Sequence, residues 1–227
     1  MSEKILCPYC LSPLEGQRKE CPFCGKSLEN LNPPGTLPFA YLLGSRYTIG
    51  KVLQVDGEGI LYAAVENVSG FRVNIKEYLP VTLSSGRDEN LIVHPKPDSE
   101  VLFKTTRMDF ADLYKTVQRI TPATGLVAVL DVLEANGTVY AVLEVTQGIP
   151  LERYLALRSG PLLPEEARSL MQPVMEGVAV LHKIGLVHRG VAPDNIRITE
   201  GGLARLGGYA TLGLRNLGSE LKAQLYE

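Results

Sequence analysis

His188-Arg189-Gly190-Val191-Ala192-Pro193-Asp194-Asn195 is the stretch of this 227-residue chain from which the fold and the chemistry can be worked out. A basic pair opens it, Gly190 follows, and Asn195 lies five residues further on. Gly190 offers neither a charge nor a side-chain hydrogen-bond acceptor. Between Ile196 and Glu227 the sequence contains no aspartate. Neither Gly190 nor the segment that follows Asn195 therefore supplies the carboxylate of an aspartate.

This stretch resembles the catalytic loop of protein kinases, in which an aspartate follows the His-Arg pair and an asparagine at the position of Asn195 helps to hold Mg²⁺. That aspartate orients the attacking hydroxyl and accepts its proton, while other carboxylate and amide groups hold magnesium on the phosphates. Gly190 stands at its position here. Leu206-Gly207-Gly208-Tyr209 matches the metal-binding Asp-Phe-Gly segment, with Gly207 in place of the second aspartate. The resemblance is to bacterial serine/threonine protein kinases and implies a domain that has lost its chemistry, a pseudokinase.

Short apolar alternations broken by glycine predict an antiparallel sheet upstream of the loop. Asn136-Gly137 predicts a tight hairpin turn between its last two strands. The strands are expected near Tyr47–Val55, Ile60–Asn67, Phe71–Tyr78, Leu126–Leu133 and Thr138–Val145.

One amphipathic helix is predicted between the third and fourth strands. Its apolar residues repeat at i, i+3, i+4 and i+7, and it is expected to end near Pro122. These residues are Phe110, Leu113, Tyr114 and Val117. Five antiparallel strands with one helix match the small lobe of a kinase, so the resemblance implies a two-lobe α+β fold.

After the sheet the pattern becomes helical, with helices predicted at Leu151–Arg158 and Pro164–Lys183, where a proline suits the first turn. We therefore expect a small lobe and hinge over residues 46–147 and a large lobe over 148–227. The large lobe of the family continues through further helices, so this one is expected to be truncated at Glu227.

The resemblance places the remains of a nucleotide site along the small lobe. Lys76 lies in Val73-Asn74-Ile75-Lys76-Glu77-Tyr78, which is similar to the family's lysine-bearing strand. The three glycines of the phosphate-covering loop fall on Gln54, Asp56 and Gly59, so one glycine is kept. A carboxylate 4 Å from a phosphate costs about 4 kcal/mol at an effective dielectric near 20. The alternative that Asp56 and Glu58 turn into solvent stays open.

The other site positions come from the same resemblance. Leu113, with Asp112 beside it, falls where the family has a glutamate that pairs with the lysine, so Lys76 is expected to lack that partner. Leu143-Glu144-Val145 resembles the hinge that accepts adenine through its backbone. The predicted nucleotide-binding residues are Lys76, Gly59, Glu144, Val145 and Asn195. Binding of ATP and Mg²⁺ is expected to be weak or absent.

All four cysteines of the chain lie in two turns, Cys7-Pro-Tyr-Cys10 and Cys21-Pro-Phe-Cys24-Gly25. Two such turns suit a closed tetrahedral Zn²⁺ site, which stabilises a segment too short to bury its own core. The alternative is a pair of disulfides, which needs an oxidising compartment. We predict a structural zinc ribbon over residues 1–29, followed by a proline-rich linker over 30–45.

Composition narrows the possible partners. With 45% hydrophobic residues and a formal net charge of −2, the chain should fold without an overall attraction to nucleic acid or anionic membranes. It lacks the apolar run of about 18 residues that a membrane span needs. We expect a cytoplasmic signalling scaffold that binds protein partners and can oligomerise. Two alternatives stay open: a divergent ATP-dependent serine/threonine kinase using Lys76 and Asn195, and a zinc-ribbon nucleic-acid or ribosome-associated binder.

Overall fold

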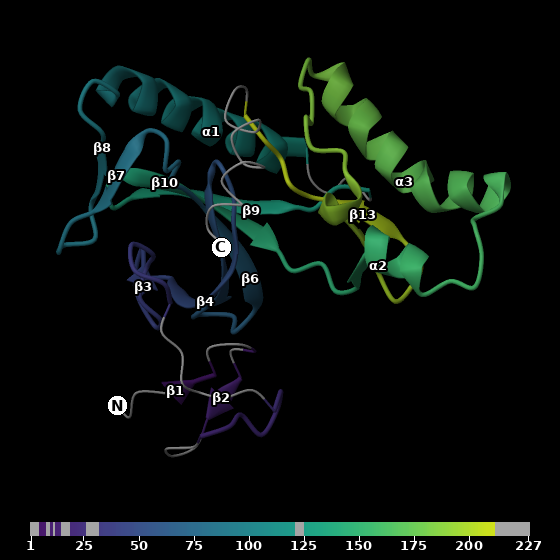
Figure 1. The fold of residues 1–227 in the computed structure, drawn as a ribbon, viewed down its shortest axis with the longest axis horizontal. Helices are drawn as coiled ribbons and strands as arrows, with labels where there is room; N and C mark the ends of the chain where they lie inside the picture. Colours follow the sequence, from purple (N-terminus) through teal and green to yellow (C-terminus); the bar gives the residue numbers. More distant parts are fainter. Residues whose placement is uncertain are drawn as a thin grey trace.

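The computed structural model describes residues 5–7, 10, 12–14, 19–25, 32–120 and 125–211. Near the N-terminus, β1 (Ile5–Leu6) and β2 (Pro13–Leu14) form a two-stranded antiparallel ribbon that carries the cysteine turns. The ribbon lies at the edge of the molecule opposite helix α1 in Figure 1. It touches the main sheet where Arg72 donates a hydrogen bond to Ser12 Oγ at 3.1 Å.

The main sheet has six antiparallel strands in the order β3-β4-β5-β6-β10-β9. Five of them overlap the predicted strands, and β4 has the predicted bounds. The residues of the hairpin turn, Asn136 and Gly137, both have positive φ, as a type I′ turn requires. The bounds are β3 (Leu42–Leu43), β4 (Tyr47–Val55), β5 (Gly59–Glu66), β6 (Arg72–Tyr78), β9 (Val129–Ala135) and β10 (Thr138–Glu144).

The sixth strand, β3, lies inside the segment expected to be a linker. Leu37 and Leu43 of this segment are fully buried in the main core, and the Leu37 amide donates to the Tyr62 hydroxyl at 3.0 Å. Residues 36–43 therefore pack on the sheet rather than bridging two bodies. The proline-rich composition of the segment does not indicate this packing, because only two of its described residues, both leucines, are buried.

Helix α1 (Glu100–Ile120) packs on β9 and β10 and matches the predicted amphipathic helix. It lies across one face of the sheet in Figure 1. The predicted endpoint at Pro122 falls outside the described residues. Phe110 contacts both Tyr78 of β6 and Tyr114 of the same helix, with ring centroids 5.4 and 4.5 Å apart. Aromatic packing thus fixes the helix on the small lobe.

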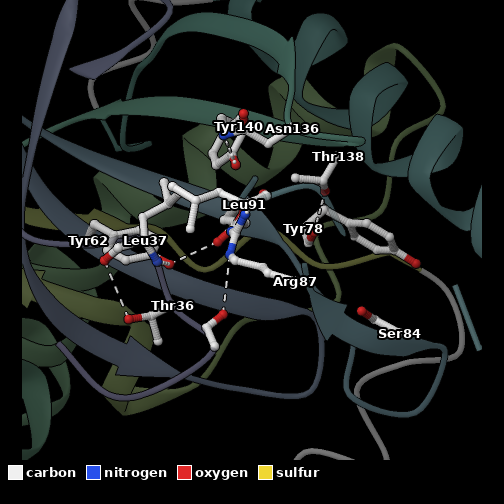
Figure 2. Close-up of polar contacts among 12 residues, drawn as sticks. Thr36, Leu37, Tyr62, Tyr78, Ser84, Arg87, Leu91, Asn136, Thr138 and Tyr140 are labelled. Carbon is white, nitrogen blue, oxygen red and sulfur yellow. Dashed lines mark hydrogen bonds and ion pairs between the residues drawn. The ribbon is translucent and has the colours of Figure 1, made fainter. Parts of the chain in front are cut away.

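A hairpin that the sequence did not predict, β7 (Ser84–Arg87) with β8 (Val93–Pro95), precedes α1. It is anchored by Arg87, which forms an ion pair with Glu77 and donates to the Leu91 carbonyl at 2.8 Å. Figure 2 shows the Arg87 guanidinium pointing into the interior beside Tyr140 and Leu91. The Tyr62 hydroxyl donates to the other oxygen of Glu77 at 2.9 Å. Both members of the ion pair are buried, so this network specifies where the hairpin packs.

The C-terminal part contains helices and a small sheet. Its two helices follow the predictions closely, since α3 has the predicted bounds and α2 is two residues shorter. The three-stranded sheet has the order β11-β12-β13. The elements are β11 (Ile149–Pro150), α2 (Leu151–Ala156), α3 (Pro164–Lys183), a 3-10 turn (Pro193–Asn195), β12 (Ile196–Ile198) and β13 (Ala204–Leu206). No helix in the described part of the chain is long and apolar enough to span a membrane.

Candidate functional site: a cysteine cluster and a cleft between the lobes

The four cysteines of the ribbon meet in space. Their Sγ atoms all lie within 4.8 Å of one another. Cys7 Sγ is 3.7 Å from Cys24 Sγ, and Cys10 Sγ is 3.6 Å from Cys21 Sγ. None of the four cysteines is in a disulfide bond, so the disulfide alternative is not what the structure contains.

This arrangement fits a tetrahedral Zn²⁺. Four thiolates at a Zn–S distance of about 2.3 Å place their sulfurs about 3.8 Å apart. Two backbone amides also point at sulfur: Cys10 N lies 3.5 Å from Cys7 Sγ, and Phe23 N lies 3.4 Å from Cys21 Sγ. Burial would raise the pKa of the Cys10 thiol, but its hydrogen bonds with Ser12, Cys7 and Cys21 lower the pKa to about 6. These groups favour the thiolate form that a metal requires.

A cleft of about 660 Å³ lies between the main sheet and the C-terminal part. Four of the five predicted nucleotide-binding residues line it: Lys76, Glu144, Val145 and Asn195. Gly59 is not among the lining residues. A glycine is required at this position for strand packing, because a Cβ on Gly59 would overlap the Glu77 carbonyl oxygen where β5 pairs with β6.

Lys76 forms an ion pair with Asp56 inside the cleft. Leu113 is buried and Asp112 exposed, so neither takes the place of the family's glutamate. Lys76 therefore lacks the family's glutamate partner, as expected, and pairs with Asp56 instead. The alternative that Asp56 turns into solvent is wrong. Burial would raise the pKa of Asp56, but the charge of Lys76 and its hydrogen bonds lower it overall. Asp56 is thus held as a carboxylate on the lysine.

The next acidic residue of the same turn contacts the far side of the cleft. Glu58 is buried and accepts hydrogen bonds from the backbone amide of Thr211, at 2.6 Å, and from the Thr211 hydroxyl. Burial raises the pKa of Glu58. The turn between β4 and β5 is therefore joined to the segment after β13. Thr211 could not be predicted as a partner of Glu58, because the two residues are 153 positions apart in the chain.

The catalytic-loop stretch is closely packed around Gly190. Its amide donates to His188 Nδ1 at 3.0 Å, and its carbonyl accepts from Asn195 Nδ2 at 2.9 Å. A Cβ on Gly190 would overlap the Gly208 carbonyl oxygen. The His188 ring is buried against Tyr209, with centroids 4.9 Å apart. His188 and Asn195 thus hold the loop together.

Gly208 matches the position of the metal-binding aspartate of the Asp-Phe-Gly segment better than Gly207 does. A Cβ on Gly208 would overlap the side chain of Asn195, the predicted metal ligand, whereas one on Gly207 would face Val127 at 3.1 Å. Tyr209 then takes the place of the aromatic residue, and its hydroxyl donates to the Val127 carbonyl at 2.7 Å. Neither glycine brings a carboxylate to the cleft.

The hinge side of the cleft is also engaged in internal contacts. Glu144 accepts a hydrogen bond from the Ala128 amide at 2.7 Å and forms an ion pair with Arg205. Val145 and Thr146 line the cleft beside it. Asp194 is exposed and also lines the cleft. Thr146 and Arg205 were not predicted as site residues, since neither lies in a recognisable motif.

Comparisons with known proteins agree with this geometry. Residues 104–212 match the family model described as the protein kinase domain. The serine/threonine-protein kinase PrkC of Bacillus subtilis is 30% identical over 110 residues, which are 44% of this chain and 17% of that protein. The serine/threonine-protein kinase PknL of Mycobacterium tuberculosis is 37% identical over 84 residues, which are 37% of this chain and 21% of that protein.

A solved structure, the apo form of PpkA-294, superposes with a TM-score of 0.69 at 25% identity and covers 84% of this chain and 66% of that chain. The chain spans less than two thirds of each of these three proteins. The family model covers most of α1, the strands β9 and β10, and the catalytic-loop stretch, of which Asp194 and Asn195 line the cleft. The chain therefore contains a protein kinase-like domain, similar to those of bacterial serine/threonine protein kinases.

Proposed function

We propose that this chain is a catalytically inactive protein kinase-like scaffold that acts in signalling through protein partners. The observation that carries the proposal is the ion pair between Lys76 and Asp56 within the cleft. In an active kinase the lysine supports the phosphates of ATP, and here a carboxylate of the same chain occupies it. A triphosphate would have to displace Asp56 and then lie beside it.

The large-lobe side of the cleft supports the same proposal. Gly190 and Gly208 supply no carboxylate, and Asn195 uses its amide nitrogen to hold the Gly190 carbonyl. Mg²⁺ on a triphosphate is held by carboxylates together with phosphate oxygens. The single side-chain amide of Asn195 is a poor substitute for these carboxylates. The loop is therefore suited to hold its own structure and not to position a reacting hydroxyl.

A second candidate function is a divergent kinase in which Asp194 replaces the missing aspartate. The observation in its favour is that Asp194 is exposed and lines the cleft together with Lys76. Its carboxylate then has to accept the proton of an attacking hydroxyl, while Asn195 contributes to metal binding. This role needs Asp56 to leave Lys76 first.

Incubation with radiolabelled ATP and Mg²⁺ separates the two candidates. The scaffold proposal predicts the same background signal for the unaltered protein and for Lys76→Met, because neither transfers phosphate. The divergent kinase predicts transfer that falls at least about 100-fold in Asp194→Asn, the magnitude that general base catalysis contributes. Circular dichroism checks that each variant is folded.

For the ribbon we propose a structural Zn²⁺ bound by Cys7, Cys10, Cys21 and Cys24, with the ribbon acting as a docking head. Neighbouring thiols that form no disulfide are typical of a reducing compartment, which supports our proposal that the protein is cytoplasmic. A site closed by four thiolates leaves no position for substrate, which supports a folding role. The hydrogen bond from Arg72 to Ser12 joins this head to the small lobe.

The Cys21→Ser variant should lose its zinc and the fold of the ribbon. Metal analysis is expected to find about one Zn²⁺ per unaltered chain and much less in the variant, because a structural zinc supplies the folding energy of such a segment. Arg72→Ala is the matched control, since it removes the contact with the lobe and leaves all four thiolates. Retention of a full equivalent of zinc by Cys21→Ser would contradict the site.

A further inference from the structure

Glu58 and Thr211 form a buried contact between the turn that joins β4 to β5 and the segment that follows β13. Both residues are 5% exposed. The Thr211 amide donates to Glu58 Oε1 at 2.6 Å, and the Thr211 hydroxyl donates to the same oxygen. Hydrogen bonds to a carboxylate are about twice as strong as those between neutral groups. One carboxylate oxygen therefore joins two parts of the chain that are distant in the sequence.

The segment Tyr209–Thr211, which we call the strap, forms part of the cleft wall. Tyr209 and Ala210 line the cleft together with Glu58. All three strap residues are buried. The first of them is held by helix α1, because the Tyr114 hydroxyl donates to the Tyr209 carbonyl at 3.3 Å. The strap therefore leads from β13 to contacts with the small lobe, and Glu58 fixes its last residue.

The turn that carries Glu58 is fixed by its own hydrogen bonds. The Glu58 amide donates to Asp56 Oδ1 at 3.0 Å, and the Glu58 carbonyl accepts the Leu79 amide at 2.8 Å. The Gly59 amide also donates to Asp56 Oδ1, at 3.1 Å. The backbone of Glu58 is thus held on both sides independently of the strap. Little conformational entropy of the turn is therefore lost when the strap binds to the carboxylate.

The contact also carries an energetic penalty, which makes it reversible. Burial raises the pKa of Glu58, and the hydrogen bonds from Thr211 and the charge of Lys76 oppose this shift only in part. The surroundings of Glu58 therefore disfavour its charged form, whereas water would solvate the carboxylate if the strap moved away. Rehydration of the carboxylate offsets part of the loss of two hydrogen bonds, so the closed and open arrangements differ little in free energy.

We propose that Glu58 and Thr211 form a latch, a reversible contact that holds the strap in the cleft wall and whose release gives the protein a second, open arrangement. On release Ala210 and Thr211 become exposed. Tyr209 stays in place, because its hydroxyl donates to the Val127 carbonyl at 2.7 Å, and it serves as the pivot. A two-state element of this kind lets a protein partner bind one arrangement in preference to the other.

The latch goes beyond the proposed function, because it would close an active and an inactive cleft alike. Hydrogen exchange at the Thr211 amide of the whole chain, followed over a series of low urea concentrations, tests it. A local opening exposes little surface, so the exchange rate at this amide should depend only weakly on urea. The amides of β10 are the reference for global unfolding, because this strand pairs with a strand on each side.

Two variants test whether Glu58 controls the opening. Glu58→Ala removes the acceptor and should speed exchange of the Thr211 amide at least about tenfold, the effect of losing a hydrogen bond to a charged group. Thr211→Val keeps the amide bond and removes the hydroxyl bond. After correction for the intrinsic exchange rate of valine, it should speed exchange by a smaller factor of about threefold.

Glu66→Ala is the matched control. Glu66 is also buried and accepts both the amide, at 2.7 Å, and the hydroxyl of one residue, Ser69, but that residue belongs to the same turn of the small lobe. The variant therefore breaks the same kind of contact at a separate place. It should leave the exchange rate of the Thr211 amide within about twofold of the unaltered chain.

Two results would overturn the latch. One is a Thr211 amide that shares the steep urea dependence of the β10 amides, because the contact would then open only when the chain unfolds. The other is equal exchange at Thr211 in Glu58→Ala and Glu66→Ala. If Glu58→Ala does not fold, the urea series on the unaltered chain and the Thr211→Val variant decide the matter. None of these outcomes depends on whether phosphate is transferred.

Discussion

Arg87→Ala should lower the free energy of unfolding by about 3–5 kcal/mol, the cost of leaving one partner of a buried ion pair uncompensated. The side chains of Arg87 and Glu77 are 3% and 0% exposed, so solvent cannot replace the lost guanidinium. Two further contacts depend on this position: Arg87 also donates to the Leu91 carbonyl and to the Gly35 carbonyl. Figure 2 shows how Arg87 reaches between the hairpin and the sheet. Urea unfolding of the whole chain measures the effect.

Two further variants identify the cause. Arg87→Met with Glu77→Gln removes both charges, keeps an acceptor for the Tyr62 hydroxyl, and should lose less stability than Arg87→Ala alone. Arg119→Ala, on the exposed last turn of α1, should change the free energy of unfolding by no more than about 0.5 kcal/mol. An Arg87→Ala protein as stable as the Arg119→Ala control would show that the ion pair does not hold the hairpin.

Gly190→Asp should fail to restore phosphate transfer and should lower stability by about 1–3 kcal/mol, the cost of forcing extra atoms into a packed site. The new Cβ would overlap the Gly208 carbonyl oxygen and approach the His188 ring to 2.9 Å. The backbone around Gly190 must shift, and the bond from Asn195 to its carbonyl shifts with it. The loop is therefore packed too closely at Gly190 to take an aspartate without rearrangement.

Gly160→Asp is the control for this substitution, because nothing lies within 4 Å of a Cβ at that position. It should alter the free energy of unfolding by no more than about 0.5 kcal/mol. Adding Gly208→Asp to Gly190→Asp restores both carboxylates and should destabilise further, since Gly208 has a φ of +70° and faces Asn195. Appreciable phosphate transfer by the double variant would mean that the loop opens more easily than its packing indicates.

Regular elements of the fold could be predicted because each shows a local pattern. Helix α3 starts at Pro164 and ends at Lys183, where the first-turn proline and the apolar periodicity place it. Strand β4 was equally well bounded by its alternation. The hairpin β7–β8 was missed because its stability comes from a non-local pair, Arg87 with Glu77, and not from alternating hydrophobic residues.

In the cleft, sequence motifs identified positions but not contacts. Lys76 and Asn195 were found because their surroundings resemble known motifs, and both line the cleft. The pairing of Asp56 with Lys76 depends on how the turn after β4 folds back, which no motif encodes. The same holds for Glu58 and Thr211, which meet only once the two lobes are in place. Gly59 matches a motif of the nucleotide site, but in the structure its role is to allow close packing of two strands.

Phosphate transfer from radiolabelled ATP in the presence of Mg²⁺ tests the central claim most directly, namely that this cleft is occupied by its own carboxylate and lacks the groups that would hold a metal-bound triphosphate. The full chain is assayed beside Lys76→Met and beside an active bacterial serine/threonine kinase as positive control. The account predicts that label incorporated by the chain equals that of Lys76→Met, with both far below the positive control. Transfer by the unaltered chain that disappears in Lys76→Met would contradict it.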